Sequence, residues 1–188
     1  MKLAVFVHRD SAAAGAAAGV GAGAVAAAVA FDDWDAPEAT KTYTCRIEHV
    51  EKAVRGALDL SDLPCLLQLL RQHALAPELI LIDGLVHLDA NETPALGRHL
   101  HHALEGRTAV IGVSKLAVPG LPAQFELVRE AEARPLMITC VGIDLGAAKA
   151  RLRAMHGKRR VPTLLKLVAR IAKDPALRPD PPRGPALG

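Results

Sequence analysis

Two short, continuously apolar runs constrain the fold of this chain more than any other feature of its sequence. They are ELILID, which covers Glu78–Asp83, and TAVIGVSK, which covers Thr108–Lys115. Runs of this kind are typical of strands that are buried on both faces of a parallel sheet. The segment between them, Ala95–Leu104, reads as a helix. A strand, a helix and a second strand in this order predict a parallel β-α-β unit.

Further elements are expected on both sides of this unit. Upstream, three strands and a helix are expected at Lys2–His8, Ala24–Phe31, Lys41–Val50 and Asp62–Leu75. Downstream, a hairpin and two helices are expected at Phe125–Glu130, Pro135–Gly142, Asp144–Gly157 and Pro162–Lys173. Ser61 is the expected cap of the first helix, with Pro64 tolerated in its first turn. This order predicts an α/β, ribonuclease H-like mixed sheet: an antiparallel three-strand meander, then parallel strands, with helices on both faces.

The segment Ala12–Ala30 carries no charge, so a membrane span has to be considered for it. It consists almost entirely of Ala and Gly with three Val, and is too weakly apolar to predict a spanning helix. We interpret it as a hairpin turn that leads into the strand at Ala24–Phe31. A helix remains the alternative, because Ala is the best helix former.

Length and cysteine content indicate one domain in a reducing compartment. The chain has 188 residues, enough to bury a hydrophobic core. Its three cysteines are few, distant and odd in number, which predicts a cytoplasmic protein rather than a disulfide framework. We expect residues 1–173 to form the domain, and the Pro-rich residues 174–188 to be a disordered tail.

Charge is distributed unevenly along the chain. Residues 1–133 contain 11 Lys and Arg against 17 Asp and Glu, a net charge of −6. Residues 134–178 contain 11 Lys and Arg against 2 Asp and Glu, a net charge of +9. A basic C-terminal third indicates a phosphate-rich partner, with a solvated helix face as the alternative.

Two charged residues are expected at neighbouring strand ends. Asp83 ends the first buried strand and Lys115 ends the next, and ligands of open α/β sheets bind beyond such ends. Gly84 lets the chain turn sharply and lets another group approach closely. A carboxylate and a lysine here suit a metal ion and a phosphate; an Asp-Gly turn and a solvated lysine are the alternative reading.

Several blocks of the sequence resemble the endonuclease V family. The core block is Asp83-Gly84, then Leu96-Gly97 and then IGVSK at residues 111–115. The upstream block RGALDLSDLPCLLQLL and the downstream block MHGKRRVPTLLK also resemble family segments. The resemblance covers residues 1–173. It implies a ribonuclease H-like fold and cleavage of nucleic acid near deaminated purine, above all inosine, with Mg²⁺ or Mn²⁺ held by carboxylates.

The resemblance assigns site residues where this sequence matches the family pattern. The strand-end aspartate is Asp83, and the family's Arg-Glu pair falls on Ser61 and Asp62. Asp62 keeps the charge but is shorter by one methylene. Asp83 and Asp62 are therefore the expected metal ligands, and Lys115 is the expected catalytic and phosphate-binding lysine.

Other family positions have changed their chemistry. The aspartate of the first strand falls on Phe6, the family's histidine falls on Ile143, and the aromatic wedge that probes the strand falls on Ala53. Asp10 and Asp144 are nearby carboxylates that could substitute. A hairpin-turn role for Asp10 and a helix-cap role for Asp144 are the alternatives, and the sequence favours them.

Several histidines and an acidic segment are further candidates for the same site. His99 and His102 share a helix face without a third ligand, which favours a solvated face. His87 could reach the mouth of the site or be a loop residue without a role. The acidic segment Phe31–Asp35 is expected at the far end of the sheet, because its strand runs antiparallel to the first one.

A basic cluster precedes the last helix. Lys158, Arg159 and Arg160 lie before a helix N-terminus, which favours anions, so together with Lys115 and Gly84 they are expected to contact nucleic acid. Two hypotheses follow: an impaired endonuclease V-like hydrolase, or a non-catalytic relative that binds DNA, RNA or a protein. The changes at the first-strand and wedge positions favour the second.

Overall fold

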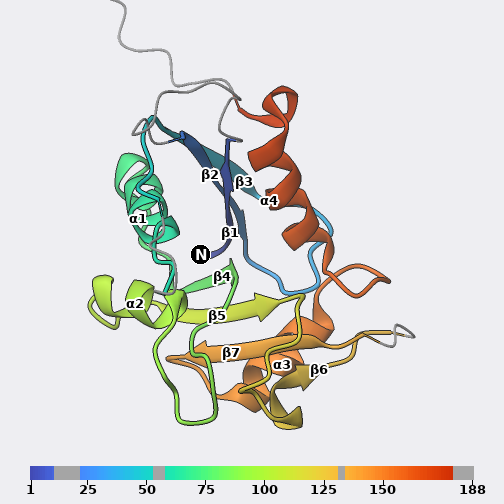
Figure 1. Cartoon of the computed structure of the whole chain (residues 1–188). Helices are drawn as coiled ribbons and strands as arrows, with labels where there is room; N and C mark the ends of the chain where they lie inside the picture. Colours follow the sequence, from blue (N-terminus) through green and yellow to red (C-terminus); the bar gives the residue numbers. More distant parts are fainter. Residues whose placement is uncertain (11–21, 53–57, 131–133, 180–188) are drawn as a thin grey trace, which may run out of the picture.

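The computed structural model describes residues 1–10, 22–52, 58–130 and 134–179. These residues form a mixed seven-stranded sheet covered by helices on both faces (Figure 1). The sheet strands are β1 Lys2–Arg9, β2 Ala24–Phe31, β3 Lys41–Ile47, β4 Leu79–Asp83, β5 Ala109–Ser114, β6 Glu126–Leu127 and β7 Leu136–Val141. The helices are α1 Asp62–Gln72, α2 Leu96–Ala103, α3 Leu145–Ala154 and α4 Thr163–Lys173, with 3₁₀ turns η1 Ala123–Phe125 and η2 Pro175–Leu177.

The strand order β3-β2-β1-β4-β5-β7-β6 confirms the predicted fold class. The first three strands are an antiparallel meander, β1–β4 and β4–β5 are parallel pairs, and β7 returns antiparallel to β5. Helices α1 and α2 pack on one face of the sheet, and α3 and α4 pack on the other. Phe31 pairs with Lys2 at the start of β1, so the acidic segment lies at the end of the sheet away from the β1 C-terminus, as expected.

Strand β2 shows why a chain with so few aromatic residues can fill its core. All eight residues of AVAAAVAF are buried, so the strand interpretation is confirmed over the helix for Ala24–Phe31. Their small side chains let α1 approach one face of the strand and α4 the other. The predicted turn at residues 11–21 lies outside the described residues.

The parallel core brings the predicted site residues to one edge of the sheet. In the β1–β4 and β4–β5 ladders, Val5 pairs with Ile82 and Asp83 pairs with Val113. The carboxyl ends of β1, β4 and β5 therefore meet. Gly112 lets the turn after Asp83 fold against β5, because a Cβ at Gly112 would lie 2.6 Å from the carbonyl oxygen of Gly84.

The described part of the predicted tail packs against the domain. Residues 175–177 form η2, and Arg178 donates hydrogen bonds to the carbonyls of Ile171 and Ala172 at 3.4 and 2.9 Å. The last residues of the tail, 180–188, lie outside the described chain. Among the described residues, every helix is too short or too polar to cross a bilayer.

Candidate functional site

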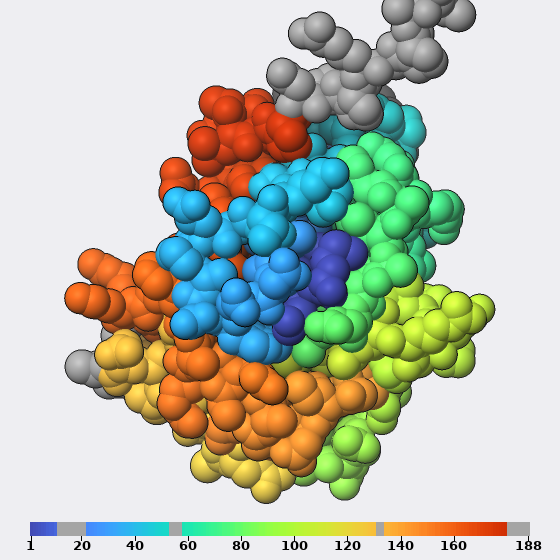
Figure 2. Space-filling view, turned by 180° about the vertical axis from the view of Figure 1, so that it is seen from behind, coloured from blue at the N-terminus to red at the C-terminus, as the bar shows by residue number. Residues whose placement is uncertain are grey.

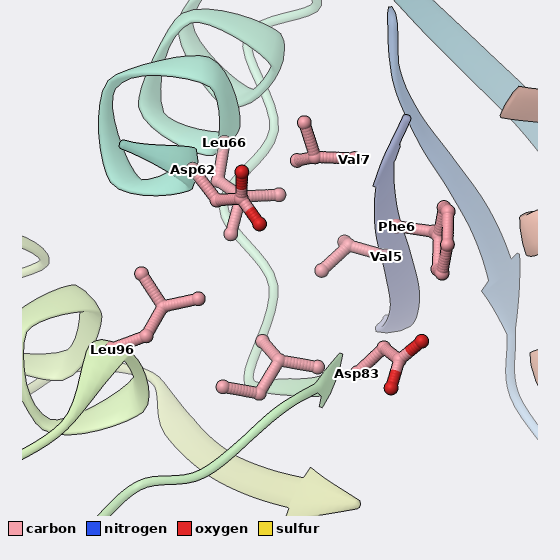
Figure 3. A pocket seen from close by; sticks show the side chains of 8 residues that line it. Val5, Phe6, Val7, Asp62, Leu66, Asp83 and Leu96 are labelled. Carbon is pink, nitrogen blue, oxygen red and sulfur yellow. The ribbon is translucent and has the colours of Figure 1, made fainter. Parts of the chain in front are cut away.

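A cleft of about 210 Å³ opens at the sheet edge between β1, β4 and the helices α1 and α2. Figure 3 shows Val5 and Val7 of β1 pointing towards Asp62 and Leu66 of α1, across the cleft. Phe6 points to the other side of β1, and the carboxylate of Asp83 turns to that same side. The two expected metal ligands therefore border one cleft, but from opposite layers of the fold.

On the α4 side of the sheet, Asp83 is paired with Lys115. The Lys115 ammonium lies 3.5 Å from Oδ2 of Asp83, with the two side chains 45% and 34% exposed. Apolar residues of the last helix and of the loop before it, Val161, Leu165 and Val168, close the space beside them. The structure thus brings together the predicted aspartate and lysine as an ion pair.

Phe6 occupies the position next to Asp83 on the neighbouring strand. Val5 is paired with Ile82, so Phe6 and Asp83 are the next positions along the parallel ladder and share a face. The Phe6 ring packs against the core under α4, and the Lys173 ammonium lies 5.2 Å from its centroid. An aromatic ring thus stands where the resemblance would place a carboxylate, with an ammonium over its face.

On the α1 side, Asp62 is held by Arg9 at the end of β1. Nε and Nη2 of Arg9 donate to Oδ1 of Asp62 at 3.0 and 2.7 Å, and Nη2 also contacts Asp59 at 3.2 Å. Burial opposes the charge on Arg9, but these two aspartates outweigh it and raise the pKa of its guanidinium. Sequence reasoning did not find Arg9, which is 53 residues from its partner.

The residue expected to cap α1 has a different role. Ser61 has helical backbone angles and makes no side-chain capping bond. Its hydroxyl donates to Asp59 instead, and this bond is the main reason that the pKa of Asp59 is lowered. Ser61 and Arg9 together fix the turn that leads into α1.

The possible substitute carboxylates serve other partners. Asp10 pairs with Arg46, whose Nη2 lies 2.6 Å from its carboxylate. Asp144 caps α3 by accepting a hydrogen bond from the Ala147 amide at 3.1 Å, which confirms its expected capping role. Asp144 therefore has the role that the sequence favoured, whereas the Asp10 carboxylate is engaged with Arg46, and the turn expected after it lies outside the described residues.

The remaining candidates lie apart from the cleft lining. His87 is only 4% exposed, contacts the Asp89 carbonyl at 2.8 Å and packs edge-on against Phe125. His99 and His102 lie on α2 at the surface. Ala53, the wedge position, lies outside the described residues.

The loop between α3 and α4 (residues 155–162, the α3–α4 loop) carries the basic cluster and projects from the body of the molecule (Figures 1 and 2). Lys158 and Arg159 are exposed. Arg160 turns inward: it donates to the carbonyls of Arg134 and Pro135 at 3.1 and 2.9 Å and to that of Lys115. Its guanidinium thus ties this loop to the strand end that bears Lys115, a structural role that the sequence did not indicate.

Comparison with known structures identifies the fold. Searches of protein-family models and of curated proteins return no match. Among solved structures, endonuclease V from Bacillus subtilis superimposes with a TM-score of 0.69 at 14% identity, covering 92% of this chain and 78% of that one. The chain has an endonuclease V-like fold. Ciona intestinalis endonuclease V, in complex with inosine-containing DNA, aligns with a TM-score of 0.66 at 15% identity, over 92% of this chain and 83% of that one.

A third endonuclease V, from Streptomyces avermitilis, has the highest sequence identity of the three, 23%, at a TM-score of 0.64. It covers 91% of this chain and 78% of that one. At such identities the likeness establishes the endonuclease V-like fold. The chemistry of the site has to be argued from the residues of this chain.

The donor set at this sheet edge does not fit the Mg²⁺ or Mn²⁺ that the resemblance implies. Hard divalent cations need several oxygen ligands around one point. The described residues contain no group of three or more His, Cys, Asp or Glu side chains placed to hold a metal ion. The two matching carboxylates, Asp83 and Asp62, are already neutralised by Lys115 and Arg9. A divalent cation would have to displace two ion pairs and would find the Phe6 ring beside Asp83.

Proposed function

We propose that this chain is an endonuclease V-like protein that binds nucleic acid and in which metal-dependent hydrolysis is severely impaired. One observation carries the proposal: the two aspartates at the family's ligand positions are ion-paired to different bases, on opposite sides of the sheet. Phe6 occupies the position beside Asp83 where a further carboxylate would be needed to complete the ligand set.

The loss of hydrolysis follows from electrostatics. Phosphodiester cleavage needs positive charge concentrated where negative charge develops on the phosphate. Here Lys115 and Arg9 each carry a single positive charge, and each is engaged with a carboxylate. Loss of one charge-stabilising element commonly lowers the rate by about a hundredfold or more, and several elements are altered together in this site.

Retention of nucleic-acid binding follows from the charge near the same sheet edge. The α3–α4 loop presents Lys158 and Arg159 to solvent, and Arg160 ties that loop to the backbone of Lys115. A Cβ at Gly84 would meet only the Ile82 side chain, at 4.0 Å, so this turn leaves room for a nucleic-acid strand to approach. We assign the contact with the phosphate backbone to Lys115, Lys158 and Arg159, and propose inosine-containing DNA or RNA as the first ligands to test.

The proposed setting is the cytoplasm, with residues 1–173 as the functional unit. Three free cysteines, two of them buried, support a reducing compartment. The contacts of Arg178 with the end of α4 indicate that the unit extends slightly past residue 173.

The test compares cleavage and binding on the same labelled oligonucleotides, with inosine or adenosine at one position. We expect the protein to bind both oligonucleotides, with an affinity that weakens as the salt concentration rises. With Mg²⁺ it should cleave neither of them above background. Asp83→Ala is the control for a contaminating nuclease, because it removes the matched aspartate without touching the α3–α4 loop. Robust Mg²⁺-dependent cleavage that Asp83→Ala abolishes would refute the proposal.

A further inference from the structure

Arg129, just after β6, is a buried arginine whose bonds go to main-chain carbonyls. It is 3% exposed. Nη2 donates to the carbonyls of Met155 and Gly157 at 2.5 and 3.2 Å, and Nη1 donates to those of Arg159 and Arg160 at 2.7 and 3.4 Å. One side chain thus gathers four carbonyls of the α3–α4 loop around a single guanidinium.

This guanidinium lacks an acidic counter-ion among the described residues. The ion pairs of the described chain do not include Arg129, and burial lowers its pKa, opposed only by the charge of the neighbouring Glu130. Burying a charge without its opposite is costly, by several kcal/mol. The carbonyl dipoles offset part of that cost, but they leave the net positive charge in place. Lys158 and Arg159 add two more positive charges on the same loop.

The four bonds from Arg129 to these carbonyls, which we call the Arg129 clamp, also fix the direction of the backbone amides. In a trans peptide the N–H points away from the C=O, so a carbonyl aimed at Arg129 turns the next residue's N–H outward. The four bonded carbonyls therefore orient the amides of His156, Lys158, Arg160 and Val161. None of these amides donates a hydrogen bond within the described chain. These amides point away from the guanidinium on the outer side of the loop, next to the exposed side chains of Lys158 and Arg159, and oriented amides beside basic side chains favour anions.

We propose that Arg129 is a positioning residue for phosphate binding by the α3–α4 loop. It holds the loop in the shape that presents its outward amides and the side chains of Lys158 and Arg159 to the phosphate backbone of a nucleic-acid strand. This inference rests on the proposed function and extends it: Arg129 acts without touching the ligand, and the ligand brings negative charge near a guanidinium that forms no ion pair within the described chain.

The experiment measures binding of a short fluorescent oligothymidylate by anisotropy over a salt series. Arg129→Lys keeps the charge but cannot reach four carbonyls at once. Arg178→Lys is the matched control, because Arg178 also bonds two main-chain carbonyls, at the end of α4. We expect Arg129→Lys to weaken binding by about tenfold and to lower the salt slope by about 0.7 for each lost phosphate contact. Arg178→Lys should bind as the unmodified protein does.

Hydrogen exchange supplies a readout that a merely structural arginine would not change. In the unmodified protein, the oligonucleotide should protect the amides of residues 156–161, and Arg129→Lys should lose this protection while its circular dichroism stays native. Unchanged affinity and slope in folded Arg129→Lys would overturn the inference alone. If that variant fails to fold, the unmodified protein decides: a complex that leaves these amides unprotected overturns the inference. An unmodified protein that binds no oligonucleotide overturns the proposed function and this inference together.

Discussion

Replacement of Phe6 by aspartate should create a divalent-cation site, which the described part of this chain does not contain. The new carboxylate would stand beside Asp83 on the same face of the sheet. The Lys173 ammonium, 5.2 Å from the Phe6 ring, would compete for it, so the variant should also carry Lys173→Gln. The double variant Phe6→Asp/Lys173→Gln thus has two adjacent carboxylates, and the Lys115 ammonium stays paired with one of them, Asp83.

The magnitude follows from burial and from ligand linkage. Phe6 is half-buried, so its loss should destabilise the fold by about 1–2 kcal/mol, below the 1.5–3 kcal/mol of a fully buried side chain. Repulsion between the carboxylates adds to this in the absence of metal. Mn²⁺ at about 100 times its dissociation constant should then restore about 2.7 kcal/mol. For a domain of this size that is a rise in melting temperature of about 5–10 °C.

The assay is thermal unfolding with Mn²⁺ and with a chelator. The control Phe6→Asn/Lys173→Gln loses the same packing but offers no negative charge, and it should unfold at one temperature in both conditions. The unmodified protein should also be insensitive to Mn²⁺. An equal Mn²⁺ shift in the control, or a comparable shift in the unmodified protein, would show that the ion pairs at Asp83 and Asp62 do not keep the metal out.

Three further outcomes are expected. The hydrogen bond from Ser61 lowers the pKa of Asp59, so its contribution to stability is complete above the ordinary aspartate pKa of about 4 and is lost as pH falls through the lower folded value; Asp59→Asn should flatten the acid limb of a denaturation series, and an unchanged limb would contradict this. Gly112→Ala would place a Cβ 2.6 Å from the Gly84 carbonyl and should lower the free energy of unfolding by about 1–3 kcal/mol in urea titrations, whereas an unchanged midpoint would show that the turn moves freely. Burial raises the pKa of Cys65 to about 11, so this thiol should resist aromatic disulfide reagents at neutral pH until urea unfolds the chain, and fast labelling of the native protein would contradict its burial.

The parts of the fold that the sequence predicted are those encoded by local patterns. Strands β4 and β5 are continuous apolar runs, and their shared edge follows from parallel pairing. That is why the sequence alone places Asp83 and Lys115 together. The cap at Asp144 was predictable for the same reason, because its bond reaches only three residues along the chain.

Contacts between distant segments set the rest of the site. Arg9 and Asp62 are 53 residues apart, and no periodicity marks them as partners. Arg129 reaches across about 30 residues to the α3–α4 loop, and its sequence context is that of an ordinary surface arginine. Both are cations placed by tertiary packing, which a one-dimensional pattern does not record.

Local chemistry was also misjudged where a side chain had two possible partners. Ser61 stands before a helix, where a capping bond is common. Its hydroxyl instead donates a hydrogen bond to Asp59, two residues earlier. Arg160 belongs to a basic run, which favoured a role at the surface. Its neighbours in space are main-chain carbonyls of Arg134, Pro135 and Lys115, so its guanidinium faces the protein.

The Arg129 clamp has a consequence for how this protein can diversify. Because the clamp bonds only main-chain oxygens, it does not depend on the side chains of the residues that it holds. Within the clamped stretch, Gly157 is tied to its residue type by a φ of +118°. Exposed positions such as 158 and 159 can therefore change identity while the loop keeps its shape. The side chains that this loop presents to solvent can therefore be replaced, by natural mutation or by design, while the fold of the domain stays the same.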